Sequence, residues 1–162
     1  MGKAVTLLNK PNETRYFLPS DGKWKLTMLP MKASTVLAEG AAMGIEIVSN
    51  TTTGNHTLFA TENAAGADFV GIMAEPVIAT DTDYATAGKL KGVRIPESKE
   101  AEAYFAVGAG TFTLADVGKT VEITTGSLGL SVDTVGKGAR ITGFISSTKG
   151  TCKFDLPTTE TT

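Results

Sequence analysis

Residues 23–29 read KWKLTML, and apolar and polar residues alternate one by one along this segment. Trp24, Leu26 and Met28 fall on one side of an extended chain, and the residues between them are Lys25 and Thr27. A period of two residues is typical of a β-strand that has one buried face. The segment therefore predicts a strand that buries Trp24, Leu26 and Met28.

Strand-like segments recur along the rest of the chain. They are bounded by Gly, Asn, Asp or Pro, and the abundant threonine together with 18 glycines favours strands and turns over helices. Besides residues 23–29, the predicted strands are residues 44–49, 57–61, 68–74, 90–95, 102–107, 120–125, 128–133, 139–146 and 151–156. Helical turns are predicted only at residues 97–104 and 114–117. We therefore predict an all-β fold, a small β-barrel or sandwich of about ten short strands with an extended N-terminal arm.

The two ends of the chain differ from its centre. Residues 1–22 are predicted to form the extended arm, because Pro11 and Pro19 oppose a helix and the segment shows no regular period. The β-barrel domain is predicted over residues 23–156, and residues 157–162 are predicted to form a flexible tail.

The beginning of the chain is also basic. Residues 1–32 contain six Lys or Arg against two Asp or Glu, a charge of +4, whereas the whole chain carries −2. We expect the arm to bind an acidic surface and to become ordered there, since it also holds apolar anchors. The candidate contact residues are Lys3, Lys10, Arg15, Tyr16, Phe17 and Leu18.

Few residues of the chain suit catalysis. His56 is the only histidine and Cys152 the only cysteine, too few for a zinc site or a nucleophile with its base. We expect an exposed loop position for His56 and a buried thiol without a disulfide for Cys152. Asp81-Thr82-Asp83 opens like a calcium loop but lacks its glycine and glutamate, and Gly88-Lys89 lacks the rest of a phosphate loop. We therefore predict that the chain is not an enzyme and that it binds no metal or cofactor.

Membranes and nucleic acids are not expected as partners. No stretch reaches the roughly 20 apolar residues that cross a bilayer. Beyond the arm the chain is acidic, whereas nucleic-acid binding needs a basic face with aromatic residues.

The most recognisable motifs lie in the C-terminal half. They are LADVGKTV at residues 114–121, GARITGFI at 138–145 and TCKF at 151–154, preceded by DFVGI at residues 68–72. With the segments between them, these motifs resemble the decoration, or cement, proteins that tailed bacteriophages add to the outside of their capsids. The resemblance covers roughly residues 65–156.

This resemblance implies a function and a location. It implies a non-enzymatic β-barrel, often a homotrimer, that is made in the host cytoplasm and binds the major capsid protein lattice on the outer surface of the virion. There it would stabilise the head against internal pressure. An extended terminal arm commonly makes contacts in such proteins, but the family pattern assigns no individual contact residue.

Two other classes remain open. One is a different virion component, such as a head-fibre base or a tail protein, which shares the Thr- and Gly-rich β composition. The other is a carbohydrate-binding module, for which the chain offers only one Trp and three Tyr as an aromatic platform.

Overall fold

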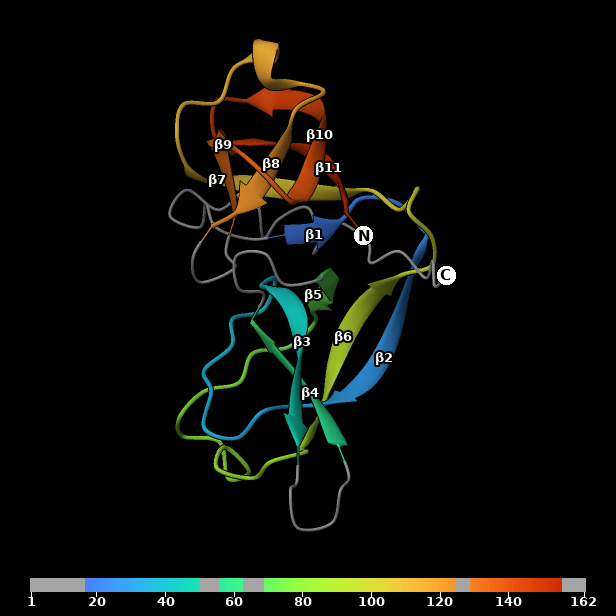
Figure 1. Cartoon of the computed structure of the whole chain (residues 1–162), viewed down its shortest axis with the longest axis vertical. Coiled ribbons are helices and arrows are strands. Elements are labelled where there is room, and N and C mark those ends of the chain that lie inside the picture. The colour runs from blue at the N-terminus through green and yellow to red at the C-terminus, as the bar shows by residue number, and fades with distance from the viewer. Residues whose placement is uncertain (1–16, 50–55, 63–68, 125–128, 156–162) are drawn as a thin grey trace.

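The computed structural model describes residues 17–49, 56–62, 69–124 and 129–155. In these residues the regular elements are eleven strands and one 3-10 turn. They form two bodies, with strands β7 to β11 in the upper one and strands β2 to β6 in the lower one (Figure 1). The predicted all-β fold is therefore confirmed, and it contains two sheets.

The upper body is a closed barrel. Its strands are β7 (Ala103–Ala109), β8 (Thr120–Ile123), β9 (Leu130–Val135), β10 (Gly138–Ser146) and β11 (Lys149–Phe154). They follow the order β7-β11-β10-β8-β9, and β9 then pairs in parallel with β7, which closes the ring. The short β1 (Phe17–Pro19) pairs with the first part of β7, where Phe17 lies opposite Phe105.

The lower body is a single antiparallel sheet. Its strands are β2 (Trp24–Pro30), β3 (Ala42–Ser49), β4 (His56–Glu62), β5 (Phe69–Met73) and β6 (Leu90–Pro96), in the order β2-β6-β5-β3-β4. One face of this sheet packs against the loops that connect its strands, where Met31, Leu37 and Val77 are buried with Met73 and Val93. The other face meets the barrel.

Four aromatic rings join the lower sheet to the barrel, and we call them the junction cluster: Phe17, Trp24, Phe69 and Phe154. Phe69 of β5 stacks on Phe154 of β11, with 3.7 Å between ring centroids and an interplanar angle of 3°. Trp24 meets both rings edge-on, and Phe17 meets Phe154 in the same way. Trp24 also donates a hydrogen bond from Nε1 to the Glu102 carbonyl over 2.9 Å. The two bodies therefore share one hydrophobic core.

All ten predicted strands are present, with ends that differ by a few residues. The predicted turn at residues 114–117 is also found, as the 3-10 turn η1 (Leu114–Asp116). Asp116 holds it by accepting hydrogen bonds from the Thr113 amide and hydroxyl and from Lys119 Nζ. The helical turn predicted at residues 97–104 is wrong. A single turn closes there between Ser98 and Ala101, and β7 follows at once because its alternate residues fill the barrel core.

The structure also corrects the predicted arm. Phe17 is fully buried and Leu18 nearly so, and both belong to β1, so the folded part includes residues that we assigned to the arm. A strand of only three residues that ends in Pro19 is too short to show a period, which is why the sequence did not indicate it. Consequently Phe17 and Leu18 are core residues in this chain and are not available as surface anchors.

The burial of Phe17 gives a direct test of this correction. Phe17→Ala should lower the free energy of unfolding by about 3 to 5 kcal/mol, because it removes a ring from the junction cluster and leaves a cavity. Leu114→Ala, at a position that is 71% exposed, is the matched control and should change it by less than about 0.5 kcal/mol. Denaturant unfolding measures both. If Phe17→Ala has the same free energy of unfolding as the wild type, Phe17 belongs to the arm and not to the core.

Candidate protein-binding surface

The residues with potential for catalysis are used in structural contacts. Cys152 is completely buried in the barrel, and burial, helped by the charge of Glu102, raises the pKa of its thiol well above the usual range. Asp81 accepts a hydrogen bond from the Ile78 amide, whereas Asp83 forms an ion pair with Lys91 at 3.3 Å. The two carboxylates of the calcium-like segment thus serve separate contacts. No group of metal-binding side chains gathers anywhere in the part of the chain that the structure describes.

His56 and Lys89 also lie in β-structure or its connections. His56 is the first residue of β4, where its backbone pairs with Ser49, and the position of its side chain lies outside the described part. Lys89 is almost completely buried, and its ammonium group donates hydrogen bonds to the Tyr84 and Lys32 carbonyls. Lys89 therefore ties two loops together, which is a structural role.

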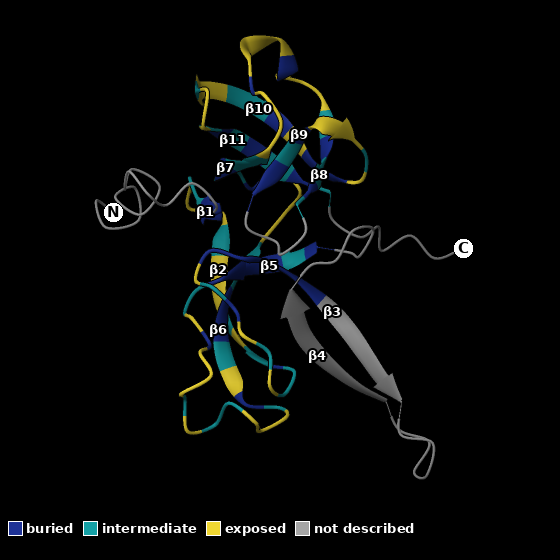
Figure 2. Ribbon diagram, turned by 90° about the vertical axis from the view of Figure 1, so that its left-hand side faces the viewer, coloured by how far each residue is buried: buried dark blue, intermediate teal, exposed yellow. Residues whose placement is uncertain are grey.

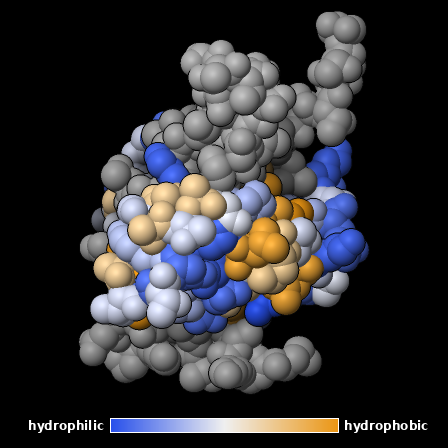
Figure 3. Space-filling model, turned by 90° about the horizontal axis from the view of Figure 1, so that it is seen from below, coloured by the Kyte–Doolittle hydropathy of each residue, from blue (hydrophilic) through white to orange (hydrophobic). Residues whose placement is uncertain are grey.

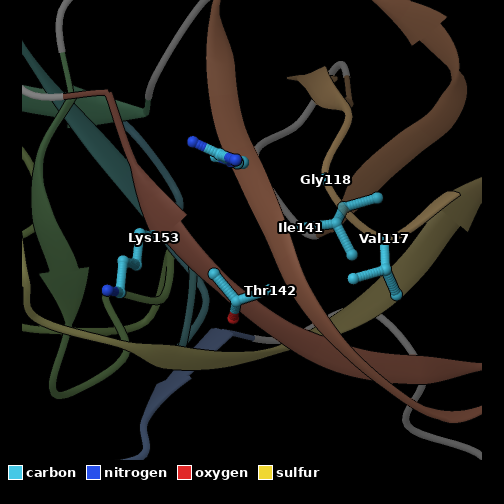
Figure 4. A pocket seen from close by; sticks show the side chains of 6 residues that line it. Val117, Gly118, Ile141, Thr142 and Lys153 are labelled. Atoms are coloured by element: carbon cyan, nitrogen blue, oxygen red, sulfur yellow. The ribbon is translucent and has the colours of Figure 1, made fainter.

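A pocket lies beside strands β10 and β11 of the barrel (Figure 4). Its volume is about 320 Å³, and its lining residues are Val117, Gly118, Arg140, Ile141, Thr142 and Lys153. Lys153 Nζ is paired with Glu100 at 2.9 Å, which raises the pKa of Lys153, and the Thr142 hydroxyl donates to Glu102. Lys153 and Thr142 are thus already occupied, and Arg140 is a charged lining residue that forms no ion pair within the described part of the chain.

A more distinctive surface lies on the ribbon formed by β2 and β6. In the antiparallel register Leu26 lies opposite Arg94, Met28 opposite Gly92 and Pro30 opposite Leu90. Residues that lie directly opposite each other point to the same face of a sheet. We call this set, Leu26, Met28, Pro30, Leu90 and Arg94, the ribbon face.

The ribbon face exposes apolar side chains. Leu26 is 58% exposed, Met28 52% and Leu90 58%. Gly92 lets Leu26 lie close to the sheet, because a Cβ added to Gly92 would come within 3.1 Å of Leu26 Cδ1. Figure 2 shows exposed and half-buried positions along β2 and β6, below the buried β5. The face is thus an apolar strip on a rigid support.

The barrel covers the upper part of this face of the lower sheet. Trp24 packs into the junction cluster, and Ile72 of β5, which lies opposite Arg94, is buried in the barrel core. The barrel reaches only this upper part of the sheet. The prediction that Leu26 and Met28 are buried is therefore wrong, because the barrel does not extend over them.

Cations flank the ribbon face, and one carboxylate, that of Glu75, lies on it, where it accepts a hydrogen bond from the Gly92 amide over 2.9 Å. Residues 23–30 and 90–96 include Lys23, Lys25, Lys91 and Arg94 and no Asp or Glu. Lys91 pairs with Asp83, whereas Lys23, Lys25 and Arg94 form no ion pair within the described part of the chain. Of these cations only Arg94 lies on the ribbon face, because Lys25 alternates with Leu26 and points to the other face of the sheet. An apolar strip beside an unpaired arginine suits a protein surface that has apolar residues and an acidic group.

A second exposed apolar pair lies in the loops of the lower body. The buried Leu37 and Val77 form a bridge, so the neighbouring Val36 and Ile78 point to the opposite side, where both are about half exposed. Seen from below, hydrophobic and hydrophilic surface lie side by side at this end (Figure 3). The loops of the lower body therefore add Val36 and Ile78 to its exposed apolar residues.

The predicted contact residues are only partly described. Phe17 and Leu18 are buried, as shown above, and Lys3, Lys10, Arg15 and Tyr16 lie outside the described residues. The ribbon face was not predicted as a site. Its one sequence signal was the absence of acidic residues from two predicted strands, and only the register shows that these strands are neighbours.

Comparison with known proteins gives no match: no protein-family model, curated protein or solved structure is significantly similar to this chain. Among the described residues, no helix is long and apolar enough to span a lipid bilayer.

The burial of Cys152 predicts its reactivity. In the native protein the thiol should react with a water-soluble disulfide reagent far more slowly than in denaturant, because it is both inaccessible and protonated at neutral pH. The rate of thiolate release, followed by absorbance with and without denaturant, measures this difference. Equal rates would mean that the barrel opens readily around β11.

Proposed function

We propose that this chain is a capsid decoration protein that binds the outside of an assembled major capsid protein lattice and stabilises it. The observation that carries the proposal is the ribbon face, where Leu26, Met28 and Leu90 are each more than half exposed beside the unpaired Arg94. An exposed apolar strip on a sheet is a feature of protein-binding surfaces. The resemblance of residues 65–156 to decoration proteins supplies the identity of the partner.

The shape of the surface supports a macromolecular partner. The ribbon face is the outer side of two paired strands, so it can bury apolar area against another protein and cannot enclose a small molecule. Arg94 would add attraction to acidic residues on the shell. In this proposal the ribbon face contributes apolar contacts and one arginine to the interface, and the predicted contacts of Lys3, Lys10, Arg15 and Tyr16 remain a prediction.

The packing of Trp24 argues against a carbohydrate-binding module. Such modules stack sugars on exposed rings, but Trp24 packs between Phe69 and Phe154, and its Nε1 already donates to the Glu102 carbonyl. The only tryptophan of the chain is therefore unsuited to form a sugar platform.

The decoration role also includes self-association. A homotrimer at a symmetry axis of the lattice would engage several capsid subunits together, so that each attachment after the first has a high effective concentration. A protein that binds the assembled form preferentially stabilises it by mass action.

The proposal predicts preferential binding to assembled shells. The protein is mixed with undecorated mature shells of the phage that encodes it and, separately, with unassembled capsid subunits. It should bind the shells much more tightly than the subunits and raise the melting temperature of the shells. Cosedimentation and calorimetry measure the two effects, and light scattering measures the oligomeric state. Equal binding to shells and subunits, or binding without a rise in melting temperature, would favour another virion component.

The ribbon face predicts which substitutions weaken this binding. Leu26→Ser with Met28→Ser should weaken binding to shells by tenfold or more, because the apolar contact is lost. Val135→Ser is the control, since Val135 is 76% exposed but belongs to the barrel. Arg94→Glu should weaken binding most at low salt, because screening reduces the attraction of the native arginine. If the control and the double variant bind alike, the contact lies elsewhere.

A further inference from the structure

Strand β2 has one edge that carries unpaired backbone groups. The Glu97 amide donates to the Lys23 carbonyl and the Met31 amide donates to the Lys89 carbonyl, each over 2.9 Å. These bonds mark the odd-numbered residues of the strand as the ones that face β6. In an antiparallel ladder, alternate residues direct their N–H and C=O groups to opposite edges. The N–H and C=O groups of Trp24, Leu26 and Met28 therefore point away from β6.

No described strand pairs with this edge. Strand β2 stands at one end of the sheet order, and within the described part of the chain it pairs with β6 alone. Strand β4, at the other end of the sheet, approaches β2 without forming a ladder with it. An edge with free donors and acceptors is a template for another strand.

The free backbone groups and the exposed side chains belong to the same residues. Leu26 and Met28 each supply a donor and an acceptor at the edge and an apolar side chain on the ribbon face. A strand added here would lie beside β2 in the lower sheet. Its side chains would extend the ribbon face and cover part of the exposed Leu26 and Met28 side chains. Pro30 has no N–H group, so the hydrogen-bond donors at this edge are the amides of Trp24, Leu26 and Met28.

The charges of β2 indicate the composition of the added strand. Lys25 is the second residue of the strand and forms no ion pair with described residues, whereas Lys23, just before the strand, lies near enough to Glu100 to contribute to the lowered pKa of that carboxyl. Lysines on an edge strand oppose pairing with a neutral or basic strand, whereas cross-strand pairs of opposite charge are favourable. The edge therefore selects an acidic strand and disfavours pairing with the β2 of another copy.

We propose that β2 binds its partner by strand addition: an extended segment with alternating apolar and acidic residues pairs with the free edge of β2 as a further strand of the lower sheet. This inference rests on the proposed function, since it describes how the ribbon face would engage a protein. It adds a backbone ladder to the apolar and charged contacts.

A matched pair of variants at Met28 tests the ladder. Met28→Ala and Met28→Pro both remove the side chain, but only the proline removes the N–H group that points to the free edge. Proline is tolerated at such edge positions, and thermal unfolding should confirm that both variants are folded. Binding of Met28→Pro to undecorated shells should be roughly tenfold weaker than that of Met28→Ala, because hydrogen bonds of the added strand are lost. Equal binding by the two folded variants overturns the proposal.

A second measurement does not depend on the shells or on the proline. The amides of Leu26 and Met28 should exchange rapidly with solvent in the free protein. A short peptide of alternating valine and glutamate should slow this exchange at least tenfold, and a peptide of alternating valine and lysine should not. Amides that are already protected in the free protein would show that β4 closes the edge, and amides that stay unprotected with the acidic peptide would show that no strand adds. Either result overturns the proposal.

The two experiments separate this inference from the proposed function. Suppose that the wild-type protein binds shells, that the double variant Leu26→Ser with Met28→Ser does not, and that Met28→Pro binds as well as Met28→Ala. The decoration role then stands without strand addition. If the wild-type protein does not bind shells but the acidic peptide protects the edge, strand addition stands and the decoration role fails.

Discussion

The stacking of Phe69 on Phe154 is the contact on which the arrangement of the two bodies depends. Phe69 belongs to the lower sheet and Phe154 to the last strand of the barrel, and their rings lie parallel with 3.7 Å between centroids. Trp24 and Phe17 pack edge-on around this pair. Aromatic rings bury large apolar areas and prefer a few mutual orientations, so a cluster of four fixes both distance and direction. The lower sheet is therefore packed against the barrel through a continuous core.

The candidate surface is a consequence of that junction. The face of the lower sheet that contains Trp24 and Ile72 enters the shared core at its upper end and continues beyond the barrel as the ribbon face. The opposite face is closed by the sheet's own loops, which bury Met31, Leu37 and Val77. Among the residues whose burial is described, the lower part of the face that carries Leu26 and Met28 thus lacks cover. Apolar residues at such a position cost little in the monomer and become useful when a partner covers them.

The polar groups of the barrel and those of the β2–β6 ribbon differ in whether they have partners within the chain. In the barrel, Lys153, Thr142 and Asp116 are satisfied by neighbouring side chains of the chain itself. On the β2–β6 ribbon, Lys25 and Arg94 have no such partner among the described residues, and the backbone of Leu26 and Met28 faces an open edge. The barrel also exposes apolar residues, such as Val135 and Ile145, but only the β2–β6 ribbon combines exposed apolar side chains, an unpaired arginine and an open backbone edge on neighbouring residues, which is why we propose it as the binding surface.

The sequence by itself determined the local structure. Alternation within residues 23–29, turn residues between short segments and the near absence of helix signals predicted the ten strands and the turn at Leu114–Asp116. It also predicted the buried thiol of Cys152, because alternation places Cys152 on the same strand face as Phe154. These features depend on neighbours in the chain, so a single sequence is enough to find them.

Tertiary structure alone decided which strand faces are covered. The pattern of Leu26 and Met28 is the same whether the face is buried or exposed, and the barrel that would cover it is built from residues 103–154, far along the chain. In the same way, Phe17 belongs to the core only because β7 offers a free edge for β1. Burial and edge pairing depend on contacts between distant segments, whereas alternation reports only the direction in which a side chain points. For that reason the strands were predictable and the ribbon face was not.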